Sequence, residues 1–189
     1  MQILSPNCYL EYFPNWLSRA EADHLFARLY ETIEWEAGEV FIFGRWHKIP
    51  RLQAWYGDAN TRYRYSGKVL IAKPWTDTLI KLRQRLIEQG FDFNSVLLNL
   101  YRNGEDKMGW HRDNEPELGV NPAIASISLG AEREFQLRHR RDKRKHTLTL
   151  GHGSLLLMTG ETQTHWEHQL PQRKRCDSPR LNLTFRKVF

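Results

Sequence analysis

Cysteine is almost missing from this chain: Cys8 and Cys176 are its only two among 189 residues, and they lie at opposite ends. So few cysteines exclude the dense disulfide framework of small secreted domains, and their spacing is unlike that of a zinc site. Long hydrophobic runs are missing too, since no segment approaches the roughly 20 apolar residues of a membrane helix. The first residues lack the basic segment and apolar run of a secretory signal. We therefore expect a protein of the bacterial cytosol, or of the cytoplasm or nucleus of a eukaryote, that is neither secreted nor membrane-bound.

Aromatic and basic residues, by contrast, are plentiful. Aromatics make up 12% of the chain, with seven Trp, and 40% of it is hydrophobic, which is typical of a folded globule and argues against disorder. The length suits one hydrophobic core, so we expect residues 1–189 to form a single domain. The net charge of +6 fits either an ordinary soluble surface or a polyanionic partner, and the positions of the charges must decide.

The N-terminal half is predicted to contain two helices. Ser18 and Glu21 have the capping-box pattern of a helix start, and apolar residues then recur at helical spacing. A second helix is predicted to begin near Thr76 or Asp77 and to end at Gly90. Residues 37–74, rich in Gly, aromatics and Arg, are expected to give short strands and loops that form a binding surface and little core. The predicted buried faces are Leu25, Phe26, Leu29, Tyr30 and Ile33 in the first helix, and Leu79, Leu82, Leu86 and Ile87 in the second.

From about residue 93 the hydrophobic pattern changes to period two, as in 96–101, which predicts strands. This many short strands after a helical half favour an α+β, mainly β protein. The expected architecture is a double-sheet jelly roll with the helices packed on one outer face. Further strands are predicted at 122–129, 133–139, 146–150, 154–159, 163–169 and 180–188.

A candidate metal site begins with His111 and Asp113, two residues apart. On a strand or extended turn such residues face the same side and can converge on one ion. The third ligand must come from elsewhere, and residues 164–168 offer His165 and His168. Two imidazoles and one carboxylate on one face of an iron leave open positions for oxygen activation. A chain with eight His often contains this spacing by chance, however, and zinc is the main rival metal.

The last predicted strand adds a second feature, because its apolar residues alternate with polar ones that share the opposite face. This fits a solvated edge strand. If the polar face instead lines the jelly-roll interior, its two guanidiniums need anionic partners. A short dicarboxylate gives one carboxylate to each, with Asn99 and Tyr101 adding hydrogen bonds. Together with the metal triad, this predicts a dicarboxylate co-substrate bound beside iron. The polar residues are Arg180, Asn182, Thr184 and Arg186.

These motifs closely resemble the AlkB family of iron- and 2-oxoglutarate-dependent nucleic-acid dioxygenases, above all the branch with the duplex-DNA repair demethylases of animals. The resemblance runs from about residue 41 to the C-terminus, and it implies a jelly-roll core over 93–189 preceded by helices and a nucleotide-recognition lid over 1–92. Its distinguishing pieces lie at 43–47, 56–59, 99–102, 111–113, 164–168 and 180–186.

The resemblance also implies residue roles. It selects His168 over His165 to complete the iron site with His111 and Asp113. Phe43 would fill the gap left by a flipped base, Tyr63 would stack on the damaged base, and Glu115 would lie near its edge. The 2-oxoglutarate contacts would be Asn99, Tyr101, Arg180, Asn182, Thr184 and Arg186. The substrate contacts would be Phe43, Gly44, Arg45, Tyr63, Arg64, Tyr65, Asn114, Glu115, Arg173, Lys174 and Arg175.

Two charged features bear on the substrate. The basic segment 173–175 matches a loop that grips the undamaged strand. The run 138–145, predicted to form a hairpin tip, would add a phosphate-binding rim if it is more than a solvated turn. Asn114 stands where close relatives carry an acid, which bears on lesion preference and leaves the iron chemistry untouched.

The implied activity is oxidative demethylation of N-alkylated bases such as 1-methyladenine and 3-methylcytosine in duplex and single-stranded DNA. It would use Fe(II), 2-oxoglutarate and O2, release formaldehyde and need only a monomer. Alternatives are an RNA demethylase or protein hydroxylase of the same chemistry, a silent nucleic-acid-binding module, and a zinc hydrolase. The intact triad argues against the silent module, and a zinc hydrolase has no evident use for the paired arginines.

Overall fold

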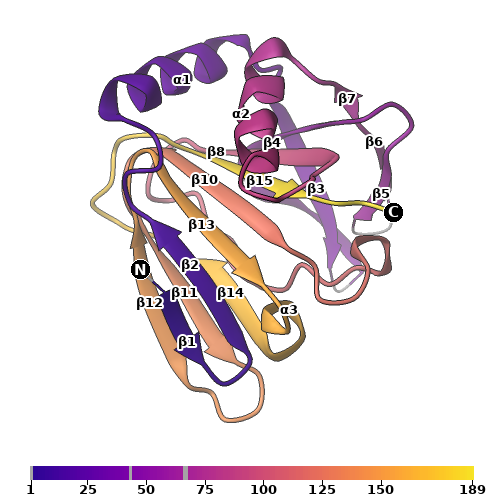
Figure 1. The fold of residues 1–189 in the computed structure, drawn as a ribbon, viewed down its shortest axis with the longest axis vertical. Coiled ribbons are helices and arrows are strands. Elements are labelled where there is room, and N and C mark those ends of the chain that lie inside the picture. The colour runs from indigo at the N-terminus through magenta and orange to yellow at the C-terminus, as the bar shows by residue number, and fades with distance from the viewer. Residues whose placement is uncertain (1, 43, 66–67) are drawn as a thin grey trace.

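The chain forms two β-sheets that lie against each other, with helices α1 and α2 at one side (Figure 1). This computed structural model describes residues 2–42, 44–65 and 68–189. Within these ranges it describes every side chain except those of residues 2–4, 40–42, 63–65 and 68–70. In these residues no helix is long and apolar enough to cross a membrane.

In the residues that the structure describes, the larger sheet has nine strands, and the smaller has four in the order β12-β11-β14-β9. In order, the larger sheet contains β1 (Gln2–Ser5), β2 (Cys8–Phe13), β13 (Ser154–Thr159), β10 (Ile124–Gly130), β15 (Arg180–Arg186), β8 (Ser95–Tyr101), β4 (Arg45–Gly57) and β3 (Glu36–Ile42), with β7 (Lys73–Pro74) beside β4. The smaller contains β12 (Lys145–Leu150), β11 (Arg133–His139), β14 (Trp166–Leu170) and β9 (Met108–His111). A separate hairpin joins β5 (Arg62–Tyr65) to β6 (Lys68–Ile71).

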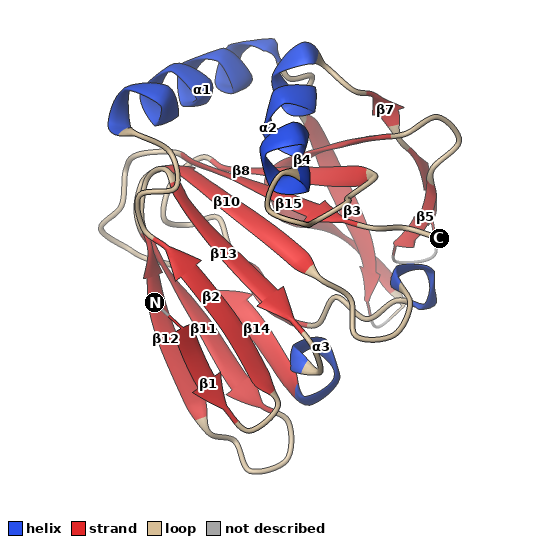
Figure 2. Cartoon of the chain, in the orientation of Figure 1, coloured by secondary structure: helices blue, strands red, loops and turns tan. Residues whose placement is uncertain are grey.

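From β10 onward the chain passes back and forth between the sheets. β10, β13 and β15 belong to the larger sheet, whereas β11, β12 and β14 belong to the smaller one (Figure 2). This crossing between two antiparallel sheets is the predicted jelly roll, so the α+β, mainly β prediction is confirmed. The larger sheet also takes in β1 to β4 from the N-terminal half of the chain.

Two helices cover the outer face of the larger sheet, as predicted. α1 (Arg19–Thr32) begins at the capping box, in which the Glu21 backbone N–H donates to Ser18 Oγ and the Ser18 backbone N–H donates to Glu21 Oε2. α2 (Asp77–Ile87) begins at Thr76, whose hydroxyl accepts from the Leu79 backbone N–H. Their apolar faces join the outward side chains of β8, β10, β13 and β15 in one core.

Several local predictions are wrong. Tyr30 is 44% exposed and lies against Phe26 from outside, and Ile87 is 37% exposed in the last turn of α2. Residues 37–74 contribute to the core after all, since residues 52–57 of β4 pair with β8 and bury Ala54 and Tyr56. The predicted strand 163–169 begins only at Trp166, because α3 (Thr162–His165) precedes it.

Candidate active site

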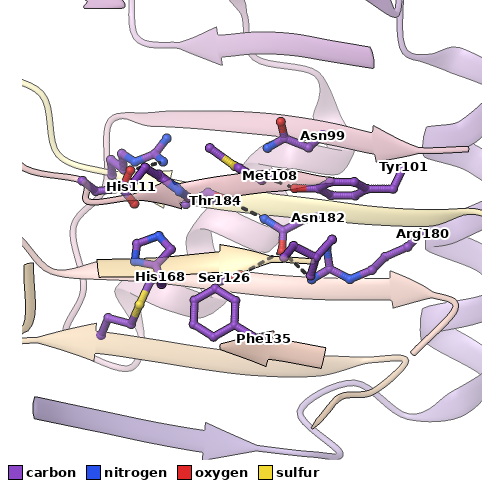
Figure 3. A pocket seen from close by; sticks show the side chains of 14 residues that line it. Asn99, Tyr101, Met108, His111, Ser126, Phe135, His168, Arg180, Asn182 and Thr184 are labelled. Atoms are coloured by element: carbon purple, nitrogen blue, oxygen red, sulfur yellow. Dashed lines mark hydrogen bonds and ion pairs between the residues drawn. The ribbon is translucent and has the colours of Figure 1, made fainter. Parts of the chain in front are cut away.

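β15 places its polar face inside the jelly roll. The strand lies between β10 and β8, so all seven of its residues are buried and the edge-strand alternative is excluded. Asn182 pairs directly with Asn99 of β8, and Arg180 pairs with Tyr101. Figure 3 shows His111 and His168 toward one end of the resulting pocket and Arg180 toward the other, with Asn182 and Thr184 between them.

The metal triad converges at the first end. One ligand atom each of His111, Asp113 and His168 lies within 4.8 Å of the other two. His111 on β9 and His168 on β14 are paired across the smaller sheet, with ring centroids 4.2 Å apart. His165 lies on α3, outside this group, with Nε2 3.9 Å from Glu161.

Hydrogen bonds orient two of the three ligands. Nδ1 of His111 lies 2.8 Å from the Gly109 carbonyl oxygen, which can only accept, so this nitrogen carries the proton and Nε2 is left for a metal. Asp113 Oδ1 accepts from Arg186 Nη2 at 2.8 Å, and both side chains are buried. The anionic partner of Arg186 therefore belongs to the protein itself, which the sequence analysis did not anticipate.

The protonation states suit a divalent cation. Burial lowers the pKa of His168 to about 3, helped by repulsion from His111, and burial also lowers the pKa of His111. Burial opposes ionisation of Asp113, but attraction to Arg186, together with the hydrogen bond from its guanidinium, outweighs it and lowers the pKa of the carboxyl. At neutral pH the site thus offers two neutral imidazoles and a carboxylate, the donor set of an Fe(II) oxygenase site. These residues fit iron.

The metal-free protein should lose stability in acid because of His168. Its imidazole takes up a proton near pH 6.5 in the unfolded chain but only near pH 3 in the folded one. Between these values the unfolded chain binds more protons, so the free energy of unfolding falls as the pH falls, by about 2 kcal/mol at pH 5. Urea unfolding at pH 7.5 and pH 5 measures the loss. It should shrink in His168→Gln, and an equal loss in that variant would contradict the assignment.

Gln163 is a site residue that the sequence analysis missed. Its side chain is 1% exposed, its Oε1 accepts from the Asp113 backbone N–H at 3.0 Å, and its Nε2 donates to Met158 Sδ at 3.5 Å. No motif marks it, because the contact spans fifty residues of sequence. The amide of Gln163 therefore fixes the backbone that presents the metal carboxylate.

Gln163→Leu should weaken divalent metal binding by roughly 10- to 100-fold, the usual cost of removing a group that orients a metal ligand. Calorimetric titration of the metal-free protein with Co(II) measures the change. Gln169→Leu is the matched control, because Gln169 lies on β14 and, within the part of the chain that the structure describes, its side chain bonds only to Gln136. Equal affinities in the two variants would show that Gln163 does not position Asp113.

The second end of the pocket contains a buried cation. Arg180 is 2% exposed, and its Nη2 donates to Ser128 Oγ and Asn182 Oδ1, both at 2.8 Å. Within the described residues it has no carboxylate partner, and its Nε has no hydrogen-bond acceptor. Burial lowers its pKa to about 10, which still leaves it charged at neutral pH. Such a group is suited to a carboxylate that comes from outside the chain.

Asn99 is held by residues that the sequence analysis did not identify. Its Oδ1 accepts from Arg51 Nε at 2.8 Å and from Gln53 Nε2 at 3.0 Å. Arg51 is 4% exposed, so a third arginine is buried beside the pocket. The signal that could have found Arg51 is its spacing, because it lies two residues before Gln53, which is paired with Asn99 where β4 lies next to β8.

The predicted substrate residues are spread over several elements. Phe43 lies outside the described residues, and so do the side chains of Tyr63, Arg64 and Tyr65, whose backbone forms part of β5. Gly44 and Arg45 are exposed where β3 turns into β4. The remaining predicted contacts are Asn114, Glu115, Arg173, Lys174 and Arg175.

Glu115 differs from its exposed neighbour Asn114. It is half-buried, and its Oε2 is buried with no hydrogen-bond partner in the described part of the chain. In the basic segment 173–175, Arg173 Nη1 donates to the Glu132 carbonyl at 2.8 Å, whereas Lys174 and Arg175 are exposed. Gly104 is needed beside this segment, since a Cβ there would lie 1.8 Å from the Arg173 carbonyl oxygen.

Comparison with known proteins gives consistent matches. A family model for the 2OG-Fe(II) oxygenase superfamily matches residues 9–186. The DNA oxidative demethylase ALKBH2 of Mus musculus is 47% identical over 90% of this chain and 77% of its own length. ALKBH2 of Bos taurus is 46% identical over 90% of this chain and 66% of its own length. The alpha-ketoglutarate-dependent dioxygenase alkB homolog 3 of Homo sapiens is 37% identical, over 94% and 65% respectively.

A comparison of folds also matches nearly the whole chain. The solved structure of OsALKBH1 aligns with a TM-score of 0.69, covering 98% of this chain and 100% of that one at 17% identity, which bears on the fold alone. The sequence relatives are longer than this chain, which spans 66% of the first of them.

Proposed function

We propose that this chain, which belongs to the AlkB family within the 2OG-Fe(II) oxygenase superfamily, is a dioxygenase that repairs DNA by oxidative demethylation of N-alkylated bases. The substrates are 1-methyladenine and 3-methylcytosine, and the carbon is released as formaldehyde. The DNA is duplex or single-stranded, the enzyme works as a monomer in the cytosol or nucleus, and residues 1–189 act as one dioxygenase domain.

One observation carries the proposal: a His-Asp-His triad and a buried arginine that has no carboxylate partner among the described residues occupy opposite ends of one pocket. His111, Asp113 and His168 would hold Fe(II). Arg180 would take the far carboxylate of 2-oxoglutarate in a bidentate contact, with Asn182, Thr184, Tyr101 and Asn99 along the wall between. When bound, iron and 2-oxoglutarate activate O2 to hydroxylate the N-methyl carbon, and the hydroxymethyl base then loses formaldehyde.

The protein's residues supply orientation and charge. Arg186 holds the Asp113 carboxylate in place, and the Gly109 carbonyl fixes the tautomer of His111. Methylation of a ring nitrogen at the pairing edge of adenine or cytosine gives the base a positive charge. Glu115, whose buried Oε2 has no hydrogen-bond partner in the described residues, supplies the opposite charge and so favours the damaged base over the normal one. Extrusion from the duplex costs least at such unpaired lesions.

The deciding experiment compares methylated oligonucleotides as duplex DNA, single-stranded DNA and RNA, with Fe(II) and 2-oxoglutarate present. We expect succinate and formaldehyde in equal amounts from DNA, and neither product when zinc replaces iron. Unmethylated oligonucleotides of the same sequence are the control. Preferential release from RNA would favour the RNA demethylase, and 2-oxoglutarate turnover without formaldehyde from any oligonucleotide would contradict nucleic-acid demethylation.

Neutralising the two exposed residues of segment 173–175, Lys174 and Arg175, should weaken duplex repair more than single-strand repair. Lys174 and Arg175 are exposed, and only a duplex has an undamaged strand for them to bind. The measurement is kcat/KM on both substrates for Lys174→Gln/Arg175→Gln, with Arg28→Gln/Lys81→Gln on α1 and α2 as the charge-matched control. Arg173 stays unchanged because its guanidinium holds the Glu132 carbonyl. Equal losses on the two substrates would remove the proposed role of this segment.

A further inference from the structure

Two arginines meet on the outer side of the metal-binding segments. Arg112 stands between the ligands His111 and Asp113, and Arg140 follows β11. Nη1 of Arg112 lies 3.4 Å from the Thr164 carbonyl oxygen, and Nη1 of Arg140 lies 3.2 Å from the same oxygen. Because both reach one acceptor, the two guanidiniums are close enough for a single small anion to touch both.

No carboxylate of the described residues compensates either charge directly. Neither arginine makes an ion pair there, whereas the neighbouring Arg138 is 2.6 Å from Glu167 and Arg144 is 2.6 Å from Asp142. Glu167 and Glu115 attract Arg112 only at longer range, and the Glu167 carboxylate is already paired with Arg138. Because both guanidiniums lie within 3.4 Å of the same carbonyl oxygen, two like charges are held close together at an electrostatic cost.

Capping of α3 accounts for only part of this arrangement. Arg112 also reaches the Gln163 carbonyl at 3.5 Å, so both arginines act on carbonyls at the C-terminal end of this one-turn helix. Among the described residues, however, only Nη1 of each guanidinium has an acceptor, and each guanidinium has five N–H donors. One carbonyl needs no second cation. The remaining donors suit an acceptor with several oxygens and a negative charge.

We propose that Arg112 and Arg140 together bind one backbone phosphate of the strand that presents its base to the metal. This rests on the proposed function, and it names a contact to the substrate strand itself. A base inside the pocket is joined through its sugar to phosphates that must remain outside it, and Arg112 is the residue directly between two metal ligands in the sequence. Phosphate is the anion that a pair of planar guanidiniums holds best.

The test measures how the affinity for a 3-methylcytosine oligonucleotide depends on salt, with Fe(II) and 2-oxoglutarate bound and oxygen excluded. Each neutralised phosphate contributes about 0.7–0.9 to the slope of log K against log salt. We expect the double variant Arg112→Gln/Arg140→Gln to lower the slope by about one such step, because the two side chains share one phosphate. Arg19→Gln, which removes a charge from α1, should leave the slope unchanged.

An unchanged slope in the double variant would overturn the proposal, and so would a drop of two steps, which would mean two separate phosphates. The single variant Arg140→Gln tests the contact without changing a residue next to the metal ligands, because Arg140 is exposed. It should raise the Kd of the oligonucleotide and leave Fe(II) binding unchanged. The proposed function fails separately, if the wild-type protein releases no formaldehyde from any methylated oligonucleotide. If the wild-type enzyme demethylates DNA but the variants have the same salt dependence as the wild type, only the proposal of a shared phosphate is overturned.

Discussion

Asp113→Ala should lose both iron binding and demethylation, and it should also destabilise the metal-free protein by about 3–5 kcal/mol. The first effect follows because the carboxylate is the only anionic member of the triad. The second follows because Arg186 is 4% exposed and donates to Asp113 Oδ1 at 2.8 Å. Removing the carboxylate takes the negative charge away from a buried guanidinium.

Asp113→Asn separates the two effects. The amide oxygen can still accept from Arg186, so the variant should keep more of its stability than Asp113→Ala while it binds iron poorly. Urea unfolding of the metal-free proteins gives the first quantity, and titration with Fe(II) without oxygen gives the second. If Asp113→Ala unfolded at the wild-type urea concentration, the buried pair would contribute nothing to stability. If it still turned over 2-oxoglutarate normally, the assignment of the metal site would be wrong.

The features that could be predicted from sequence have a short period or sit on adjacent residues. The alternation along 180–186 predicted a strand with one polar face, and the spacing of His111 and Asp113 predicted two ligands on one side. The structure has the strand with one polar face and the two ligands on one side, because β15 lies inside the larger sheet and β9 is paired with β14. The position of the apolar residues alone could not tell a buried polar face from a solvated one. The family resemblance decided that point.

The features that could not be predicted depend on contacts between distant segments. Gln163 reaches Asp113 across fifty residues, and Arg186 reaches it across seventy-three. α3 replaces the first part of a predicted strand, and the Thr162 hydroxyl at its start donates to the nearby Thr159 carbonyl and accepts from the distant Tyr9 backbone N–H. A glutamine or threonine in the sequence carries no signal of such a contact, since its role arises only after the sheets have packed.

Arg180→Met should act in opposite directions on co-substrate binding and on stability. In the absence of 2-oxoglutarate, Arg180 is a buried cation with no carboxylate partner among the described residues, so an apolar side chain of similar length should leave the protein at least as stable. With 2-oxoglutarate present, the same change removes the group that pairs with the far carboxylate. The Kd of 2-oxoglutarate should rise roughly 30- to 5,000-fold, which is a loss of about 2–5 kcal/mol in binding free energy.

Unfolding in urea, with and without 2-oxoglutarate, measures both effects in one assay. A ligand at 100 times its Kd stabilises the folded state by about 2.7 kcal/mol, so the wild-type protein loaded with metal should gain this much and Arg180→Met at most about 0.9 kcal/mol. Arg180→Lys is the control, because it keeps the charge but loses the planar fork, and it should fall between the two. A variant that binds 2-oxoglutarate as tightly as the wild type would show that the far carboxylate lies elsewhere. In that case Arg180 would serve only the hydrogen bonds to Ser128 and Asn182.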